Sequence, residues 1–220
     1  MNKYSRVVLF ASLFQFTTLL LHAQAPFQDE IKTFKKEDSS HFPGLHKILF
    51  VGSSSFNFWK DVQDYFPNHP IINRGFGGSS LPDVIRYANE IIFPYRPKQI
   101  VIYCGDNDLA ASDSVTAQTV EKRFKELFFL IRKKIPGVPI VFVSIKPSPS
   151  RAYLMPRMVQ TNQLIKQFLA HQKKAVYIDV YHKMLLPDGK PIPEIFKQDS
   201  LHMNPKGYAI WKKAIGPHLK

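Results

Sequence analysis

Four polar or small residues that could support nucleophilic chemistry follow an apolar run at residues 48–51. Ile48–Val51 is apolar on both faces, and Gly52, Ser53, Ser54 and Ser55 come directly after it. A serine on a tight strand-to-helix turn is held exposed above a sheet, where the helix N-terminus favours developing negative charge. Serine is also a preferred helix N-cap, so this stretch alone favours a cap.

A carboxylate and an imidazole lie close together near the end of the chain. Asp199 and His202 in "DSLHMNPKGYAIW" are three positions apart, so in a turn they can face the same way. The carboxylate could orient the imidazole and leave its other nitrogen free as a general base. The rival carboxylate, Asp179, lies within a strand pattern and is expected to be structural.

Two further segments could donate hydrogen bonds to an oxyanion. Gly75, Gly77 and Gly78 in "INRGFGGSS" bring backbone N–H groups close to any ligand in the crevice. Asn107 in "YCGDNDLAASDS" could add a side-chain amide. The structural alternatives are a turn that needs positive φ angles at the glycines and an Asx-turn at the asparagine.

Residue spacing argues against other kinds of site. The glycine segment has Ser80 at the sixth position of a dinucleotide fingerprint and follows the second strand, which disfavours a nucleotide. Counted from Asp106, a calcium loop would need glycine and glutamate where the chain has Ala111 and Ala117. Cys104 is the only cysteine, which excludes an intrachain disulfide and cysteine-cluster zinc sites. It is expected to be a buried, inert thiol.

Strand-like and helix-like segments alternate along the rest of the chain. The expected strands are Lys47–Val51, Ile71–Gly75, Gln99–Cys104, Pro139–Ile145 and Ala175–Val180. The expected helices are Asn57–Tyr65, Leu81–Phe93, Ser114–Ile135, Met155–Gln172 and Pro205–His218. This alternation predicts an α/β fold, a single three-layer doubly wound domain with a mostly parallel sheet. Ligands bind such sheets at the carboxyl ends of the strands, where all the segments above are expected to lie.

The N-terminal residues have the pattern of a secretory signal. Lys3 and Arg6 precede an apolar stretch that ends before Ala23-Gln24-Ala25, so residues 1–25 are expected to be a signal peptide. Polar residues interrupt the stretch and disfavour a permanent transmembrane helix. Residues 26–46 are polar without clear periodicity and are expected to be a lead-in segment. The mature protein is expected to be periplasmic or extracellular, without stable membrane insertion.

The chain is strongly basic. Its net charge is +13, and removing Lys3 and Arg6 leaves +11. Such a field favours anionic envelope polymers, acidic glycans or lipid headgroups, although a solvated basic surface is the more common explanation. The basic residues are scattered, and with the expected export this argues against nucleic acid as a partner.

Taken together and in order, the polar segments resemble those of the SGNH hydrolase superfamily, the GDSL-type esterases and lipases. The matching blocks are "GSS" at 52–54, "NRGFGG" at 73–78, "GDND" at 105–108 and "DSLH" at 199–202. The resemblance spans residues 47–220. It implies a flavodoxin-like, parallel five-stranded sheet of order 2-1-3-4-5 and serine esterase chemistry on an ester substrate, without metal or cofactor.

Roles for individual residues follow from this resemblance. Ser54 would be the nucleophile, His202 the general base and Asp199 its partner. The oxyanion hole would consist of the backbone N–H groups of Ser54 and Gly78 and the side-chain amide of Asn107.

Two positions depart from the family pattern. Ser53 stands where the family usually has aspartate, and Ser200 stands where glycine is frequent. Neither position takes part in bond making, and the first departure is expected to affect the rate rather than the mechanism. Ser53 is expected to change how the turn at the nucleophile is braced.

The sequence constrains the substrate only loosely. Short strand-to-helix loops suggest no lid, which favours small acyl groups such as acetyl esters of carbohydrate. Phe56, Phe58 and Trp59 could line a sugar or acyl surface or pack in the core. A lysophospholipase-like lipid esterase, an acyltransferase and a catalytically silent glycan-binding protein remain alternatives, and the oligomeric state stays open. A flavodoxin-like redox protein would leave Asp199 and His202 without a role.

Overall fold

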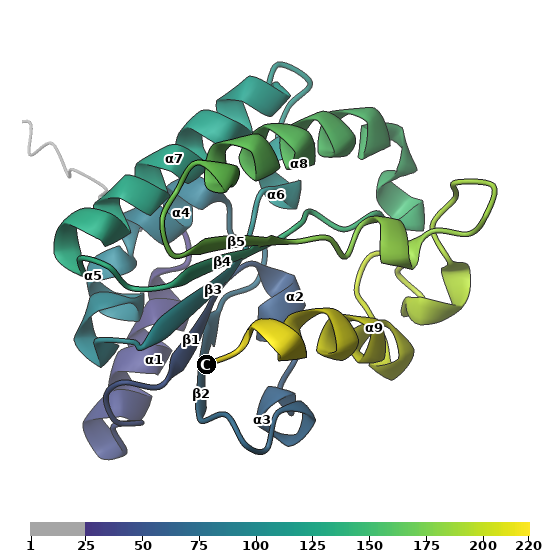
Figure 1. Ribbon diagram of the computed structural model, residues 1–220. Coiled ribbons are helices and arrows are strands. Elements are labelled where there is room, and N and C mark those ends of the chain that lie inside the picture. The colour runs from purple at the N-terminus through teal and green to yellow at the C-terminus, as the bar shows by residue number, and fades with distance from the viewer. Residues whose placement is uncertain (1–24) are drawn as a thin grey trace, which may run out of the picture.

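The computed structural model describes residues 25–220 and contains one five-stranded parallel sheet (Figure 1). The strands are β1 (Ile48–Gly52), β2 (Ile71–Gly75), β3 (Gln99–Tyr103), β4 (Ile140–Val143) and β5 (Ala175–Ile178). Their order is β2-β1-β3-β4-β5, which confirms the expected topology. The expected signal peptide, apart from Ala25, lies outside the described residues.

Helices cover both faces of the sheet, as the expected three-layer fold requires (Figure 1). One face carries α1 (Gln28–Ser40), α4 (Leu81–Arg86), α5 (Ala88–Ile91), α7 (Ala117–Lys134) and α8 (Met155–Ala170). The other carries α2 (Ser54–Asn57), α3 (Val62–Tyr65) and α9 (Pro205–Ile215). The short helix α6 (Asp106–Ala110) follows β3. The short 3₁₀ helices are η1 (Phe93–Tyr95), η2 (Pro149–Leu154), η3 (His182–Met184), η4 (Pro193–Ile195) and η5 (Gly216–His218).

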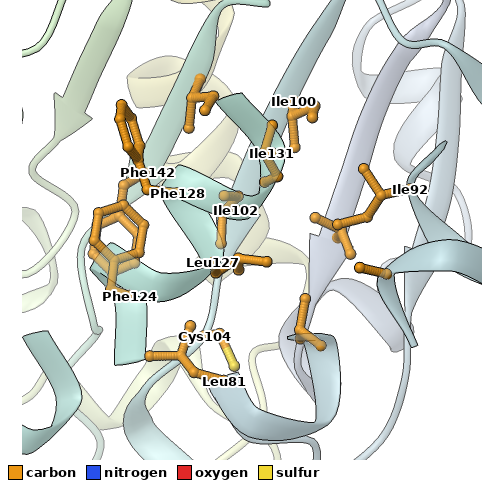
Figure 2. Close-up of a cluster of buried hydrophobic side chains, with 14 of the residues drawn as sticks. Leu81, Ile92, Ile100, Ile102, Cys104, Phe124, Leu127, Phe128, Ile131 and Phe142 are labelled. Carbon is orange, nitrogen blue, oxygen red and sulfur yellow. The ribbon is translucent and has the colours of Figure 1, made fainter. Parts of the chain in front are cut away.

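Alternate residues of the central strands enter two separate cores. In β1, Leu49 and Val51 belong to the core on the sheet face that carries α7, whereas Ile48 and Phe50 belong to the core on the face that carries α9. Figure 2 shows the first core, where aromatic and aliphatic side chains of α7 meet β3 and β4. Cys104 lies in this core, and burial raises the pKa of its thiol, in agreement with an inert residue. Burial on both faces is typical of parallel sheets and explains the continuous apolar runs in the sequence.

The helix expected over Asn57–Tyr65 is instead two short helices, α2 and α3. The interruption has a physical reason in β2, because Asn73 donates its side-chain amide to the carbonyls of Phe56 and Trp59 at 2.7 and 3.3 Å. These carbonyls are therefore satisfied by the neighbouring strand instead of a continuing helix. The helix expected over Leu81–Phe93 is likewise divided into α4, α5 and η1.

The lead-in segment contains a helix that its sequence did not predict. Helix α1 carries Asp38, which forms an ion pair with Arg74 of β2 and accepts a hydrogen bond from Tyr95 Oη at 2.6 Å. Arg74 Nε in turn donates to Tyr95 Oη at 2.7 Å, and its guanidinium lies 4.9 Å from the Phe34 ring centre. Asp38, Arg74 and Tyr95 thus each bond to the other two, and these bonds fix α1 to β2, the strand that leads into the glycine segment.

Replacing Asp38 by alanine is expected to destabilise the protein by about 3 kcal/mol, because Arg74 would be left largely buried without its partner. The free energy of unfolding in urea measures this directly. Glu37→Ala, an exposed carboxylate on the same helix, is the matched control and should change that energy by less than about 0.5 kcal/mol. Equal unfolding energies for the two variants would contradict this role for Asp38.

Candidate active site

The turn after β1 is built around a glycine that no other residue can replace. Gly52 has φ 136°, and a Cβ there would lie 1.9 Å from the carbonyl oxygen of Tyr103 in β3. Ser53 follows in the N-cap position of α2, but its side chain makes no capping hydrogen bond. Ser54 is the first residue of α2, and its hydroxyl is directed toward the C-terminal part of the chain. The cap interpretation therefore does not describe Ser54.

Ser54, His202 and Asp199 form a continuous hydrogen-bonded chain. The His202 Nε2 atom lies 3.1 Å from Ser54 Oγ, and Nδ1 lies 2.6 Å from Asp199 Oδ2. The other carboxylate oxygen accepts the backbone N–H groups of Leu201 and His202, each at 2.9 Å. The structure thus brings together three residues from opposite ends of the domain in the order that a serine hydrolase uses.

Hydrogen bonding keeps the Asp199 carboxylate ionised. Burial acts to raise its pKa, but the hydrogen bonds from the backbone and imidazole of His202 and from the backbone of Leu201 outweigh burial and lower the pKa to about 2. An ionised Asp199 holds a proton on Nδ1 of His202. Nε2 is then the acceptor available to the Ser54 hydroxyl.

Asp179, the rival carboxylate, belongs to a different pair. It lies just after β5 and contacts His182 Nδ1 at 2.6 Å. This pair has the same three-residue spacing as Asp199 and His202. Among the described residues, however, no side-chain hydroxyl or thiol bonds to His182, so the pair lacks a nucleophile.

Two backbone N–H groups are available beside Ser54. The glycine segment is tied to the nucleophile turn, since Phe76 N and Ser79 Oγ both donate to the Gly52 carbonyl at 2.9 and 3.1 Å. Gly78 has φ 76° in this segment. Within residues 25–220, the backbone N–H groups of Ser54 and Gly78 donate to no protein acceptor. Both are therefore available to donate to a further acceptor, such as an oxyanion.

The side chain of Asn107 also lies beside the nucleophile turn, but its amide hydrogens already have acceptors. It is the second residue of α6, and its Nδ2 donates to Ser53 Oγ at 2.8 Å and to the Ser79 carbonyl at 3.0 Å. Both amide hydrogens are thus engaged, and Asn107 must exchange one partner to reach an oxyanion. The hydroxyl of Ser53, fully buried, acts as the acceptor at the position where the family usually has aspartate.

The other departure from the family pattern is also explained by geometry. Ser200 has φ 55°, a left-handed conformation that glycine adopts without strain. Its carbonyl accepts hydrogen bonds from the backbone N–H and Oγ of Ser150 at 3.1 and 2.9 Å. These bonds help to hold the turn that carries Asp199 and His202.

Of the three aromatic residues after the serines, one lines the site. Phe56 and Trp59 are fully buried in the core beneath α9, whereas Phe58 is 43% exposed. Its ring meets the His202 imidazole edge to face, with centroids 4.5 Å apart. The ammonium of Lys197 lies 4.9 Å from the centre of the Phe58 ring.

The start of the described chain contacts the glycine segment. Phe27 packs edge to face on Phe76 at 5.3 Å, and its ring lies 3.7 Å from where a side chain at Gly78 would begin. Tyr87 Oη fixes this segment by donating to the Pro26 carbonyl at 2.6 Å. The lead-in segment therefore forms one wall beside the candidate oxyanion hole.

Two cationic residues near the site were missed by the sequence analysis. Lys146 is almost fully buried and donates its Nζ to the Leu201 carbonyl at 2.8 Å, and Arg151 donates to the Asn107 Oδ1 atom at 2.9 Å. Both belong to "SIKPSPSR", which directly follows β4. The sequence did offer a signal for these two residues, because the segment is polar and follows a buried strand. It was overlooked because it belongs to none of the four family blocks.

The GDSL-like Lipase/Acylhydrolase family matches residues 50–210. This chain belongs to that family. The match confirms the resemblance on which the residue roles were based, and the family consists of enzymes that act on esters. No curated protein is similar enough in sequence to match this chain.

Solved structures agree with the fold of this GDSL-like protein. A Bacteroides fragilis protein assigned as an acylhydrolase has a TM-score of 0.74 and 20% identity, covering 89% of this chain and 96% of its own. A GDSL-like lipase from Bacteroides thetaiotaomicron has a TM-score of 0.70 and 19% identity, with coverages of 86% and 96%. An acetylxylan esterase from Geobacillus stearothermophilus has a TM-score of 0.61 and 16% identity, with coverages of 78% and 93%.

The described part of this esterase-family chain contains no group of three or more histidine, cysteine, aspartate or glutamate side chains arranged to hold a metal ion. Within the same residues, no helix is both long enough and apolar enough to cross a membrane.

The buried Lys146 is expected to make stability depend on alkaline pH. Burial lowers its pKa from 10.5 to about 8, an effect that Arg151 increases and that Asp106 and Asp199 partly offset. Between pH 8 and 10.5 the unfolded chain binds more protons at this residue, so the contribution of Lys146 to the free energy of unfolding should rise with pH. The full rise from this group is on the order of 3 kcal/mol.

Urea unfolding at pH 7.5 and pH 10 tests this dependence in the wild type, Lys146→Met and the exposed control Lys36→Met. From pH 7.5 to pH 10 the unfolding energy of the wild type should change more favourably than that of Lys146→Met, and the control should behave as the wild type does. The same change with pH in the wild type and Lys146→Met would show that Lys146 does not titrate in this range.

Proposed function

We propose that this protein is an exported serine esterase in which Ser54 forms an acyl-enzyme. The observation that carries the proposal is the hydrogen-bonded chain from Ser54 through His202 to Asp199. Together with two free backbone N–H groups beside Ser54, it supplies a nucleophile, a base, an orienting carboxylate and donors to an oxyanion.

The first half of the reaction transfers the acyl group to the enzyme. Ser54 Oγ attacks the ester carbonyl carbon while His202 Nε2 accepts the hydroxyl proton, and Asp199 stabilises the imidazolium. The C–O bond to the leaving alcohol then breaks, and His202 returns its proton to that oxygen. Water attacks the acyl-Ser54 ester by the same steps in reverse, which releases the acid and restores the serine.

The charge that develops on the carbonyl oxygen is stabilised by nearby donors. The backbone N–H groups of Ser54 and Gly78 serve without rearrangement, because neither has a protein acceptor in the described chain. Asn107 becomes the third donor when one of its amide hydrogens leaves Ser53 Oγ for the oxyanion. Removal of one such donor typically costs roughly 2.7–4 kcal/mol of transition-state stabilisation.

Small-acyl esters of carbohydrate are the substrates that the site favours. The Asp199 side chain is 47% exposed and that of His202 is 20% exposed, so this end of the triad borders a surface that an extended glycan can reach. The leaving alcohol must approach His202, and the exposed ring of Phe58 beside it provides a face on which a sugar can stack. The structural likeness to an acetylxylan esterase is consistent with this choice.

The exposed ring of Phe58 also supports a second candidate, a lipid esterase, because an acyl chain could pack on the same surface. Rising activity with acyl length would favour it. An acyltransferase would use the same residues and would be recognised by transfer of the acyl group to an added alcohol. The ordered triad argues against a silent glycan-binding protein.

Export is proposed from the N-terminal sequence pattern, which lies outside the described residues except for Ala25. The net charge of +11 that remains without Lys3 and Arg6 suits a substrate within an anionic envelope or matrix. Secretion of a tagged full-length chain, with N-terminal sequencing of the product, tests this part of the proposal. Retention of residues 1–25 in the mature protein would contradict it.

Ser54→Ala is expected to lower kcat for p-nitrophenyl acetate by at least about 10³-fold, because it removes the nucleophile. Ser55→Ala is the matched control, since Ser55 is the next residue but makes no bond to His202. The control should retain most of the activity. Comparable activity in Ser54→Ala and the wild type would reject the proposed mechanism.

Phe58→Ala is expected to lower kcat/KM for acetylated xylo-oligosaccharides by about tenfold, or ~1.4 kcal/mol, while kcat/KM for a small alkyl acetate changes little. Phe129→Ala, which removes an exposed ring on α7, is the control and should affect neither substrate. An equal loss on both substrates would argue against a sugar-stacking role for Phe58.

A further inference from the structure

The side chain of Arg151 joins the first two residues of α6, the short helix after β3. Arg151 lies in η2, the 3₁₀ segment after β4, and its side chain is only 17% exposed. One terminal nitrogen, Nη1, donates to Asp106 Oδ2 at 3.1 Å, and the other, Nη2, donates to Asn107 Oδ1 at 2.9 Å. The guanidinium is therefore held by a carboxylate while it binds the oxygen of the candidate oxyanion amide.

This contact determines which way the Asn107 amide faces. The oxygen end accepts from a permanent cation, and the nitrogen end donates toward Ser53 and Ser79, beside the nucleophile turn. If the amide were rotated by half a turn, its NH₂ group would oppose the donors of Arg151. Arginine has no acceptor, so that arrangement would lose the hydrogen bond and place two donors in contact.

The only charged partner of the Asn107 amide among residues 25–220 is at its oxygen end, because position 53 is a neutral serine. The hydroxyl of Ser53 is a weaker acceptor for the amide than a carboxylate would be, because charge-assisted hydrogen bonds are roughly twice as strong. A charged partner is instead present at the opposite end of the amide, where Arg151 binds Oδ1. Hydrogen bonding at Oδ1 polarises the amide and strengthens the Nδ2 hydrogens as donors.

The segment that carries Arg151 is itself fixed to the histidine turn. Ser150 donates twice to the Ser200 carbonyl, and Lys146 donates to the Leu201 carbonyl. The position of Arg151 is therefore tied both to the Asn107 helix and to the turn that holds Asp199 and His202. These contacts favour a role for Arg151 in holding α6 and the turn with Asp199 and His202 in fixed positions relative to each other.

We propose that Arg151, anchored by Asp106, is a positioning residue of the oxyanion hole that fixes and polarises the Asn107 amide. The inference rests on the proposed esterase function. It predicts that Arg151 acts through Asn107, so its removal matters only while that amide is present. A residue that merely stabilised the fold would act independently of Asn107.

A double-mutant cycle separates these two roles. Arg151→Met should lower kcat for p-nitrophenyl acetate by about 10- to 100-fold, with KM changed less than about twofold, because the amide acts on the transition state. In an Asn107→Ala background the same substitution should change kcat by less than about threefold. If the loss of kcat in the double variant were instead the product of the losses in the two single variants, the proposal would be overturned.

Arg157→Met is the control for removing an arginine from the same region. Arg157 pairs with Asp113 and makes no contact with Asn107, so kcat should stay within about twofold of the wild type. Arg151→Lys keeps the charge but not the fork that spans Asp106 and Asn107. It serves as the second variant if Arg151→Met does not fold, and its loss of kcat should likewise disappear in the Asn107→Ala background.

The Ser54→Ala variant, measured in the same assay, distinguishes a failure of the Arg151 proposal from a failure of the esterase proposal. Turnover that needs Ser54, together with independent effects of Arg151 and Asn107, would overturn only the role of Arg151. Turnover that does not need Ser54 would overturn both.

Discussion

β1 lies between β2 and β3 inside the sheet, and at its end the chain passes so close to the Tyr103 carbonyl that only a glycine fits. This close approach directs the chain out of the sheet at Gly52. The next two residues then take up the N-cap and first position of α2, with Ser54 facing His202. All other parts of the site are placed relative to this turn.

The glycine segment and α6 are fixed to the same turn by hydrogen bonds. Phe76 and Ser79 donate to the Gly52 carbonyl, and Asn107 joins Ser53 to Ser79. Because β1, β2 and β3 are parallel neighbours, these three strand ends lie at one edge of the sheet. The topology thus explains how residues far apart in sequence form one site.

The site also contains buried charge, which is costly for the fold. Lys146 and Arg151 lie close to one carboxylate, Asp106, and one oxygen of that carboxylate is buried without a hydrogen-bond partner among residues 25–220. Burying charged groups generally lowers stability unless they are well paired. Their hydrogen bonds give a functional reason for this arrangement. Lys146 bonds to the Leu201 carbonyl in the turn that carries the proposed base, and Arg151 bonds to the Asn107 amide of the proposed oxyanion hole.

Much of this arrangement could be predicted from the sequence. The buried strands appear as continuous apolar runs, and the residues that end them carry the family blocks, so the sheet order and the meeting of Ser54, Asp199 and His202 were accessible. The four family blocks were sufficient to place the site at one edge of the sheet.

The features that were missed depend on contacts between distant segments. Helix α1 is fixed by Arg74 and Tyr95, and the break between α2 and α3 depends on Asn73. The engagement of Asn107 by Ser53 and Arg151 likewise requires three strand ends to be in place. No local pattern in the sequence records such contacts.

The most direct test of the central claim is the identity of the serine that reacts with an ester-like electrophile. Incubation of residues 26–220 with a fluorophosphonate, followed by peptide mass spectrometry with fragmentation, would locate the covalent adduct among Ser53, Ser54 and Ser55. We predict one adduct on Ser54, with labelling abolished by His202→Ala because the base is lost. Labelling of another serine, or labelling of Ser54 that is unaffected by His202→Ala, would contradict the account.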